Sequence, residues 1–197
     1  MKLNEYSAKL RLAEVGISIP QGQVATTPEE ARQIAQDIGG PVYVKAQVTL
    51  SNRALMNGIQ RAADPEAAFE IAALILDMTL NGLIVERVLV ETAIDAIQEL
   101  YIGITYDRTT NKPMLVIASD GGIELESAVS QKPNAFFRET ITPLIGLRAY
   151  QITTITSQLN LPREYWPGLQ HIALALYDCF VASDAELIEI NPLAITT

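Results

Sequence analysis

The stretch TPEEARQIAQDIGGPVYVKAQV, residues 27–48, sets the fold class of this chain. Thr27 is a good helix N-cap, a proline follows at the first helical position, and Glu30 can complete a capping box. Gly39-Gly40-Pro41 then ends the helix. The β-branched and apolar run at 42–48 is typical of a strand. A helix therefore leads directly into a strand here.

The same signals extend outward on both sides of this stretch. Asparagine or aspartate caps, Gly and Pro stops and β-branched runs predict further helices and strands. Expected helices lie near 4–16, 64–75, 147–159 and 167–181, and expected strands at 23–25, 83–91, 99–107, 113–119, 136–142 and 185–190. The strands 99–107 and 113–119 are expected to form an antiparallel pair, and Asn81-Gly82 is expected to form a turn. Because helices and strands interleave, the sequence favours an α+β or mixed α/β class over an all-α or all-β fold.

Composition excludes several classes of protein. Fourteen Lys and Arg against 23 Asp and Glu give a net charge of −9, which argues against nucleic-acid binding. A single cysteine, Cys179, excludes an internal disulfide and a Cys-based zinc cluster, and His171 has no second histidine. Both lie in the expected helix 167–181, where packing or surface roles are the simpler interpretation. No run approaches the ~20 apolar residues of a membrane span, so a cytoplasmic protein is expected.

Lys45 interrupts an otherwise apolar strand. An ammonium is costly to bury alone, so such a lysine is either paired, bound to an anionic ligand, or placed where its head reaches water. The link 51–58 follows directly and carries Arg53, with Asn52 and Asn57 able to adopt unusual backbone angles. This link is either a phosphate-binding loop or an ordinary surface loop.

Acidic and amide side chains lie at the ends of other expected strands. Glu91 closes one strand and Glu99 opens the next, where each can accept from a nucleoside or act as a solvated cap. Glu189 and Asn191, two positions apart, would present two oxygen ligands on one strand face. Such ligands suit Mg²⁺, although a polar strand end is the alternative interpretation. Pro192 is expected to end the ladder.

Together these segments resemble the ATP-grasp domain of the succinyl-CoA synthetase (succinate–CoA ligase) β-subunit family over essentially the whole chain. The resemblance implies a two-lobed ATP-grasp fold, with mixed or antiparallel sheets flanked by helices and a nucleotide held between the lobes. It treats residues 1–197 as a single ATP-grasp domain, with lobe one at about 20–93 and lobe two at about 1–19 plus 94–197. The segments that carry it are 3–6, 8–9, 25–31, 44–48, 89–91, 99–103, 107–108, 121–126 and 187–193.

The resemblance also implies roles for individual residues. Lys45 matches the lysine that contacts the phosphates, and Glu91 the carboxylate that holds the nucleoside. Glu99 and Ile94 match further nucleotide contacts, the latter through its backbone. The implied phosphate loop is Asn52, Arg53 and Ala54, and the implied Mg²⁺ ligands are Asn191 with Glu189 beside it.

The implied reaction joins a carboxylate, succinate by default, to CoA, as in the tricarboxylic acid cycle. ATP or GTP is consumed with Mg²⁺, and acyl-CoA, nucleoside diphosphate and phosphate are formed. The implied partner is an α subunit that carries the phosphohistidine, and neither nucleic acid nor a membrane is expected.

The sequence departs from the family pattern in two respects. Asn52 and Ala54 replace glycines of the family's phosphate loop, and Leu55 replaces a lysine. The sequence also ends at Thr197, before the family's second Mg²⁺ ligand and its C-terminal domain. The chain is therefore expected to bind nucleotide without turnover alone. The alternative is a degenerate ATP-grasp domain that serves as a scaffold or regulatory subunit.

Overall fold

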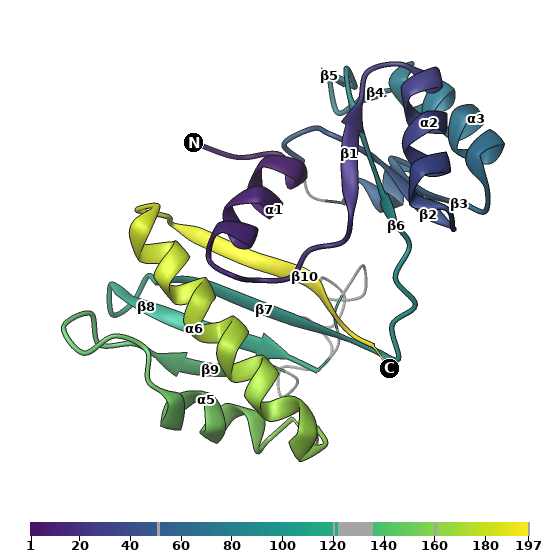
Figure 1. Ribbon diagram of the computed structural model, residues 1–197. Coiled ribbons are helices and arrows are strands. Elements are labelled where there is room, and N and C mark those ends of the chain that lie inside the picture. Colours follow the sequence, from purple (N-terminus) through teal and green to yellow (C-terminus); the bar gives the residue numbers. More distant parts are fainter. Residues whose placement is uncertain (51, 120, 122–135, 160, 197) are drawn as a thin grey trace. The chain divides into compact units, whose positions relative to one another are not determined.

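The computed structural model describes residues 1–197 except 51, 120, 122–135, 160 and 197. The described residues form two compact units, the first made of Met1–Ala13 and Ser18–Asp95 and the second of Glu14–Ile17 and Ala96–Thr197 (Figure 1). Each unit contains strands and helices, so the expected α+β class is confirmed. Part of the expected 121–126 segment lies outside the described residues.

The first unit is built on a four-stranded antiparallel sheet. Its strand order is β1-β6-β2-β3, so strands distant in sequence are neighbours in the sheet. The bounds are β1 Gly22–Ala25, β2 Val42–Ala46, β3 Ile59–Ala62 and β6 Val88–Thr92. In β2 the exposure alternates, with Val42, Val44 and Ala46 buried in the core and Tyr43 and Lys45 half-buried on the opposite face.

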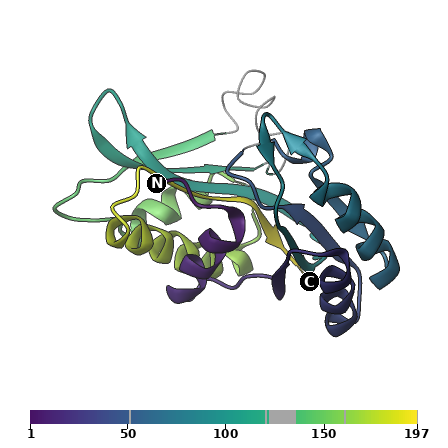
Figure 2. The same cartoon turned by 90° about the horizontal axis from the view of Figure 1, so that it is seen from above.

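Helices α2 (Pro28–Ile38) and α3 (Pro65–Leu76) pack beside each other against this sheet (Figure 2). Both begin at the expected caps, because Thr27 accepts from the Glu30 amide at 3.2 Å and Asp64 from the Ala67 amide at 2.8 Å. The Glu30 carboxylate accepts from the Thr26 amide instead of the Thr27 amide of an ordinary capping box. Small alanines on the two helices allow close packing on the valines of the sheet.

Helix α1 (Glu5–Glu14) belongs to the first unit up to Ala13. Asn4 caps it by accepting from the Ser7 amide at 2.9 Å. The Tyr6 amide donates to the Gln47 side chain at 2.9 Å, which ties the helix to the segment after β2. The expected lobes placed residues 1–19 with 94–197, whereas these contacts group the start of the chain with the first unit.

The expected strand 83–91 is interrupted in the structure. Its beginning forms a small hairpin, β4 (Thr79–Leu80) with β5 (Leu83–Ile84), and its end is β6. Asn81 and Gly82 form the turn of that hairpin, with φ of 47° and 83°. Two successive residues with positive φ are typical of a type I′ hairpin, which the Asn-Gly pair favours.

The second unit contains an antiparallel sheet in the order β10-β7-β8-β9. Helices α5 (Ala149–Thr156) and α6 (Trp166–Ala182) cover one face of it, as Figures 1 and 2 show. The strand bounds are β7 Gln98–Asp107, β8 Lys112–Ala118, β9 Phe136–Thr140 and β10 Leu187–Ile195. The expected pairing of the segments near 99–107 and 113–119 is confirmed. Among the described residues, no helix has the length and apolarity needed to cross a membrane.

The expectation that Pro192 ends the last ladder is wrong. Ile190 pairs with Ile102, the register shifts, and pairing with β7 resumes at Leu193 opposite Leu100. Two residues of β10 thus face one residue of β7, which is a bulge. Because proline cannot donate to a ladder, the bulge lets β10 continue past Pro192 without an unpaired donor.

Candidate functional site

The residues predicted to bind nucleotide and metal fall in both units, and each unit is described separately. The first unit holds Lys45, Asn52, Arg53, Ala54, Glu91 and Ile94, and the second holds Glu99, Glu189 and Asn191.

In the first unit, three predicted residues meet in one group of charges. The charge cluster consists of Glu5, Lys9, Lys45, Arg53 and Glu91. The Lys45 ammonium lies 2.7 Å from Glu91 and 3.0 Å from Glu5. Arg53 lies 2.5 Å from Glu5, and Lys9 reaches both carboxylates, at 2.9 Å and 2.5 Å. Lys45 is therefore paired, as one sequence interpretation proposed.

Strand register explains why Lys45 and Glu91 meet. Tyr43 pairs with Glu91 across β2 and β6, and Lys45 is two residues along the same face of β2. On the other side of β6, Gly22 of β1 pairs with Glu91. A Cβ atom at position 22 would lie 2.5 Å from the Cβ of Glu91, so only glycine leaves room for the strand pair as it stands.

Arg53 reaches the cluster from the link after β2. Its Nη1 donates to the Ala46 carbonyl at 2.6 Å while Nη2 donates to Glu5. Asn52 precedes it with φ of 64°, a left-handed backbone that asparagine tolerates, as the sequence predicted. Ala54 begins the short helix η1 (Ala54–Met56), and Gly58 closes the link by donating to the Arg53 carbonyl at 2.8 Å.

The side chains of the cluster are largely shielded from water. Glu91 is 3% exposed, and the side chains of Lys45 and Arg53 are 17% and 14% exposed. Burial alone raises the pKa of Glu5, but Lys45, Lys9 and Arg53 together outweigh it and hold that pKa well below its usual value. Burial likewise lowers the pKa of Lys45, yet Glu5 and Glu91 raise it overall. Glu5 and Lys45 are therefore both charged near neutral pH.

Ile94 and Glu99 lie outside the charge cluster. Ile94 follows β6 and its side chain is exposed, while Glu99 is an exposed residue of β7. The Ala93 amide donates to the Pro41 carbonyl at 2.9 Å, which fixes the backbone just before Ile94. The Glu99 carbonyl accepts from the Gly121 amide at 3.1 Å.

In the second unit, Glu189 is held by a neighbouring tyrosine. The Tyr101 hydroxyl donates to the Glu189 carboxylate at 2.9 Å. Burial and the Glu189 charge raise the pKa of Tyr101, so the hydroxyl keeps its proton. Gly103 pairs with Glu189, and a Cβ there would lie 2.6 Å from the Tyr101 hydroxyl. Glycine at this position therefore leaves the space that the tyrosine crosses.

The donor set of β10 suits a hard cation. Asn191 is exposed near the bulge two residues beyond Glu189, and the two residues offer amide and carboxylate oxygens. One Glu189 oxygen accepts from Tyr101, which leaves the other for a ligand. Within the described ranges, no group of three His, Cys, Asp or Glu residues could hold a metal ion by itself. A cation here would need further oxygens, such as those of a bound phosphate.

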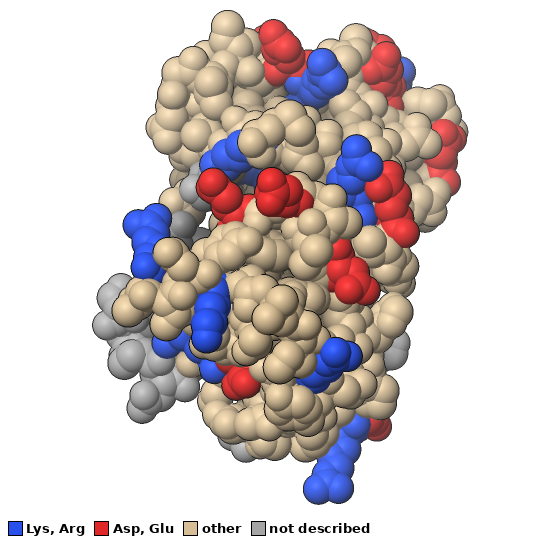
Figure 3. All heavy atoms as spheres, turned by 90° about the vertical axis from the view of Figure 1, so that its left-hand side faces the viewer, with Lys and Arg blue, Asp and Glu red and all other residues tan. Residues whose placement is uncertain are grey.

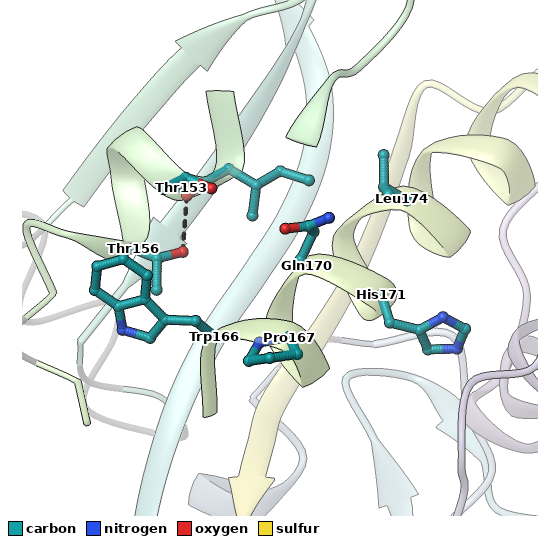
Figure 4. Close-up of a pocket in the computed structure, with 8 residues that line it drawn as sticks. Thr153, Thr156, Trp166, Pro167, Gln170, His171 and Leu174 are labelled. Atoms are coloured by element: carbon teal, nitrogen blue, oxygen red, sulfur yellow. Dashed lines mark hydrogen bonds between the residues drawn. The ribbon is translucent and has the colours of Figure 1, made fainter. Parts of the chain in front are cut away.

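A separate pocket lies between α5 and α6 of the second unit (Figure 4). It has a volume of about 350 Å³ and is lined by residues that include Thr156, Trp166, Gln170 and His171. None of the predicted nucleotide or metal residues lines it. His171 is exposed and Cys179 is buried in α6, in agreement with the packing and surface roles expected from the sequence.

Charges elsewhere do not form a large patch on the face shown in Figure 3. Acidic and basic side chains of the described part are interspersed there, without a broad basic surface.

Sequence reasoning missed Glu5 and Lys9. The two residues are four apart on α1, a spacing that places a glutamate and a lysine on one helix face. This spacing is visible in the sequence, but it does not show that the two side chains contact Lys45 of β2 and Glu91 of β6. The contact between Glu5 and Lys45 joins residues 40 positions apart.

Comparison with known proteins shows the family to which this chain belongs. The chain matches the ATP-grasp domain family over residues 2–195. It belongs to the ATP-grasp family. It is 39% identical, over its whole length, to the ADP-forming succinate–CoA ligase β subunit of Pyrobaculum arsenaticum and covers 52% of that protein. It is 41% identical to the corresponding protein of Herpetosiphon aurantiacus, with 99% of this chain and 52% of that protein covered.

A GDP-forming relative is also similar to this ATP-grasp chain. The GDP-forming succinate–CoA ligase β subunit of Thermus thermophilus is 37% identical, again over the whole chain and 52% of the relative. The resemblance to succinate–CoA ligase β subunits is thus confirmed. The chain spans about half the length of the curated relatives it matches.

Solved structures support the ATP-grasp fold. An acetyl-coenzyme A synthetase of Ca. Korarchaeum cryptofilum has a TM-score of 0.80 at 17% identity, with 98% of this chain and 87% of that chain covered. ATP citrate lyase from Methanothrix soehngenii has a TM-score of 0.73 at 16% identity, with 99% of this chain and 47% of that chain covered. At these identities the likeness concerns the fold alone.

Proposed function

We propose that this chain is the nucleotide-binding part of a succinate–CoA ligase-like enzyme. The observation that carries the proposal is the meeting of Lys45 and Arg53 in one cluster of the first unit. Two cations that share a carboxylate can also share a phosphate, since both groups present negatively charged oxygens. ATP-grasp membership over residues 2–195 supports the same assignment.

The remaining residues receive proposed roles on this basis. Asn52 and Ala54 flank Arg53 in the proposed phosphate loop, and Glu91, Glu99 and the Ile94 backbone are proposed nucleotide contacts. Glu189 and Asn191 are proposed Mg²⁺ ligands, with nucleotide oxygens completing the shell. When bound, Mg²⁺ would offset the charge of the phosphates.

The proposed reaction of the whole enzyme forms a thioester. A carboxylate, CoA and ATP or GTP give acyl-CoA, nucleoside diphosphate and phosphate. We propose an α subunit that carries a phosphohistidine as the partner, a cytoplasmic location, and no turnover by this chain alone. Phosphoryl transfer depends chiefly on positioning and charge neutralisation, which is the part that Lys45 and Arg53 can supply.

A second candidate is a scaffold or regulatory ATP-grasp domain that does not turn over ATP. The substitutions Asn52, Ala54 and Leu55 favour it, since side chains replace the family's glycines and an apolar residue replaces its lysine. Leu55 is 65% exposed and adds no charge to the loop. Cβ atoms on the loop also hinder a close backbone approach to phosphate.

A thermal-shift titration with Mg–ATP and Mg–GTP distinguishes the two candidates. Ligand at 100 times its dissociation constant adds ~2.7 kcal/mol of stability, which a melting curve detects readily. We expect a concentration-dependent rise in the melting temperature that Lys45→Ala abolishes. Absence of a shift at millimolar nucleotide would favour the scaffold, and a shift that survives Lys45→Ala would place the nucleotide elsewhere.

A further inference from the structure

We propose that Glu5 is an internal competitor for the nucleotide phosphate. Its carboxylate takes the anion position between Lys45 and Arg53, and a phosphate group must replace it when nucleotide binds. This inference rests on the proposed function, because it assumes that these two cations bind phosphate.

The geometry resembles that of a bound anion. One oxygen of Glu5 lies 3.0 Å from the Lys45 ammonium, and the other lies 2.5 Å from Nη2 of Arg53. The carboxylate thus bridges the two cations with its two oxygens, as a phosphate group can do. Glu5 comes from the first turn of α1, whereas Lys45 lies on β2 and Arg53 in the link that follows.

Glu5 occupies a donor of each cation while it is in place. The Lys45 ammonium has three N–H donors and uses two of them on Glu5 and Glu91. Arg53 directs one terminal nitrogen to the Ala46 carbonyl and the other to Glu5. Both side chains are more than four-fifths shielded from water. Displacing Glu5 would return donors on both cations to an incoming anion.

Glu5 also has a partner when it is displaced. Lys9, four residues later on the same helix, already lies 2.9 Å from its carboxylate. The exchange of carboxylate for phosphate therefore leaves Glu5 with a cation of its own helix. Glu91, in contrast, is buried and held by Lys9 and Lys45, so it is the carboxylate that stays.

This arrangement predicts opposite effects on stability and on affinity. Replacing Glu5 by glutamine removes one charged partner of Lys45 and the carboxylate that pairs with Arg53, so the nucleotide-free protein should melt at a lower temperature. The same change removes the competing charge, so Mg–ATP should bind more tightly. If Glu5 only positioned the two cations, its replacement would lower both the stability of the protein and its affinity for Mg–ATP.

The test is isothermal titration of the full 197-residue chain with Mg–ATP. For Glu5→Gln we expect a dissociation constant lower by about tenfold, since one opposing unit charge leaves the immediate neighbourhood of both cations. Glu70→Gln is the matched control, because Glu70 is an exposed glutamate of α3 in the same unit and its replacement changes the net charge equally. We expect Glu70→Gln to bind like the unmodified chain.

A double variant tests whether Glu5 weakens nucleotide binding by occupying the anion position or only by its negative charge. The charge cluster contains three cations and two carboxylates, and Glu5→Gln with Lys9→Gln keeps its net charge at one positive unit. If Glu5 competes by occupying the anion position, the double variant still binds more tightly than the unmodified chain. If it binds equally, net charge alone explains the effect and the inference is wrong.

Hydrogen exchange of the unmodified chain tests the same inference without a variant. Saturation with Mg–ATP should increase exchange in the first turns of α1, because Glu5 loses its contacts to Lys45 and Arg53. Slower exchange there, or equal or weaker binding by Glu5→Gln, overturns the inference and leaves the proposed function intact. If neither the unmodified chain nor Glu5→Gln binds Mg–ATP, the proposed function fails together with the inference.

Discussion

Glu5 is the residue whose importance is least visible in the sequence. It contacts Lys9, Lys45 and Arg53, yet it lies 40 and 48 positions before the last two. Lys45 gave a signal because a charged residue in an apolar strand needs an explanation. Glu5 gave none, because a glutamate in the first turn of a helix is ordinary. The pairing of Glu5 with Lys45 is therefore known only once the chain is folded.

The lowered pKa of Glu5 predicts a specific dependence of stability on acid. A carboxyl whose pKa is lower in the folded state stabilises the protein fully above its ordinary value of 4.5. That contribution declines as the pH falls below this value, by at most about 1.4 kcal/mol for each pH unit. Urea unfolding of the unmodified chain and of Glu5→Gln should thus give a stability difference that is constant near neutrality and shrinks below pH 4.5. A difference that does not change with pH would show that Glu5 is not ionised in these ion pairs.

At the scale of elements, short-range signals predicted the helices and the glycine turns. Thr27, Asp64 and Asn4 cap the helices that were expected to begin at these residues. These signals act within three or four residues, so they survive in the folded protein whatever packs against the helix. The Asn81–Gly82 turn was predicted for the same reason.

The strand ends were less predictable, because pairing partners determine them. The run 83–91 was expected as one strand, but its first residues pair with β4 and its last with β1 and β2. Pro192 was expected to end β10, but a bulge absorbs it. Neither outcome depends on local propensity alone.

The contact of β1 with β6 predicts the effect of one glycine substitution. In Gly22→Ala the new Cβ would lie 2.5 Å from the Cβ of Glu91 and 2.7 Å from the Val90 carbonyl. The strands must separate, and we expect a loss of about 1–3 kcal/mol in the free energy of unfolding, as for other overpacked sites. Gly40→Ala is the control, because a Cβ at that position meets no atom within 4 Å. Equal stability of the two variants in urea would contradict the close packing of β1 on β6.

At the scale of the whole molecule, the candidate residues divide between the two units. The first unit supplies the charge cluster, and the second supplies Glu189, Asn191 and Glu99. A family resemblance over essentially the whole chain predicted nucleotide-binding roles for Lys45, Arg53 and Glu91. The fold brings these three residues together in the charge cluster. It could not predict that two carboxylates already neutralise most of the cationic charge there.

The central proposal is that Lys45 and the residues around it bind a nucleotide. Hydrogen exchange measured by mass spectrometry, with and without saturating Mg–ATP, tests this claim most directly. We predict slower exchange in the segments 43–58 and 88–95, which carry Lys45, Arg53 and Glu91. Unchanged exchange in both segments, or protection confined to the α5–α6 pocket, would contradict it.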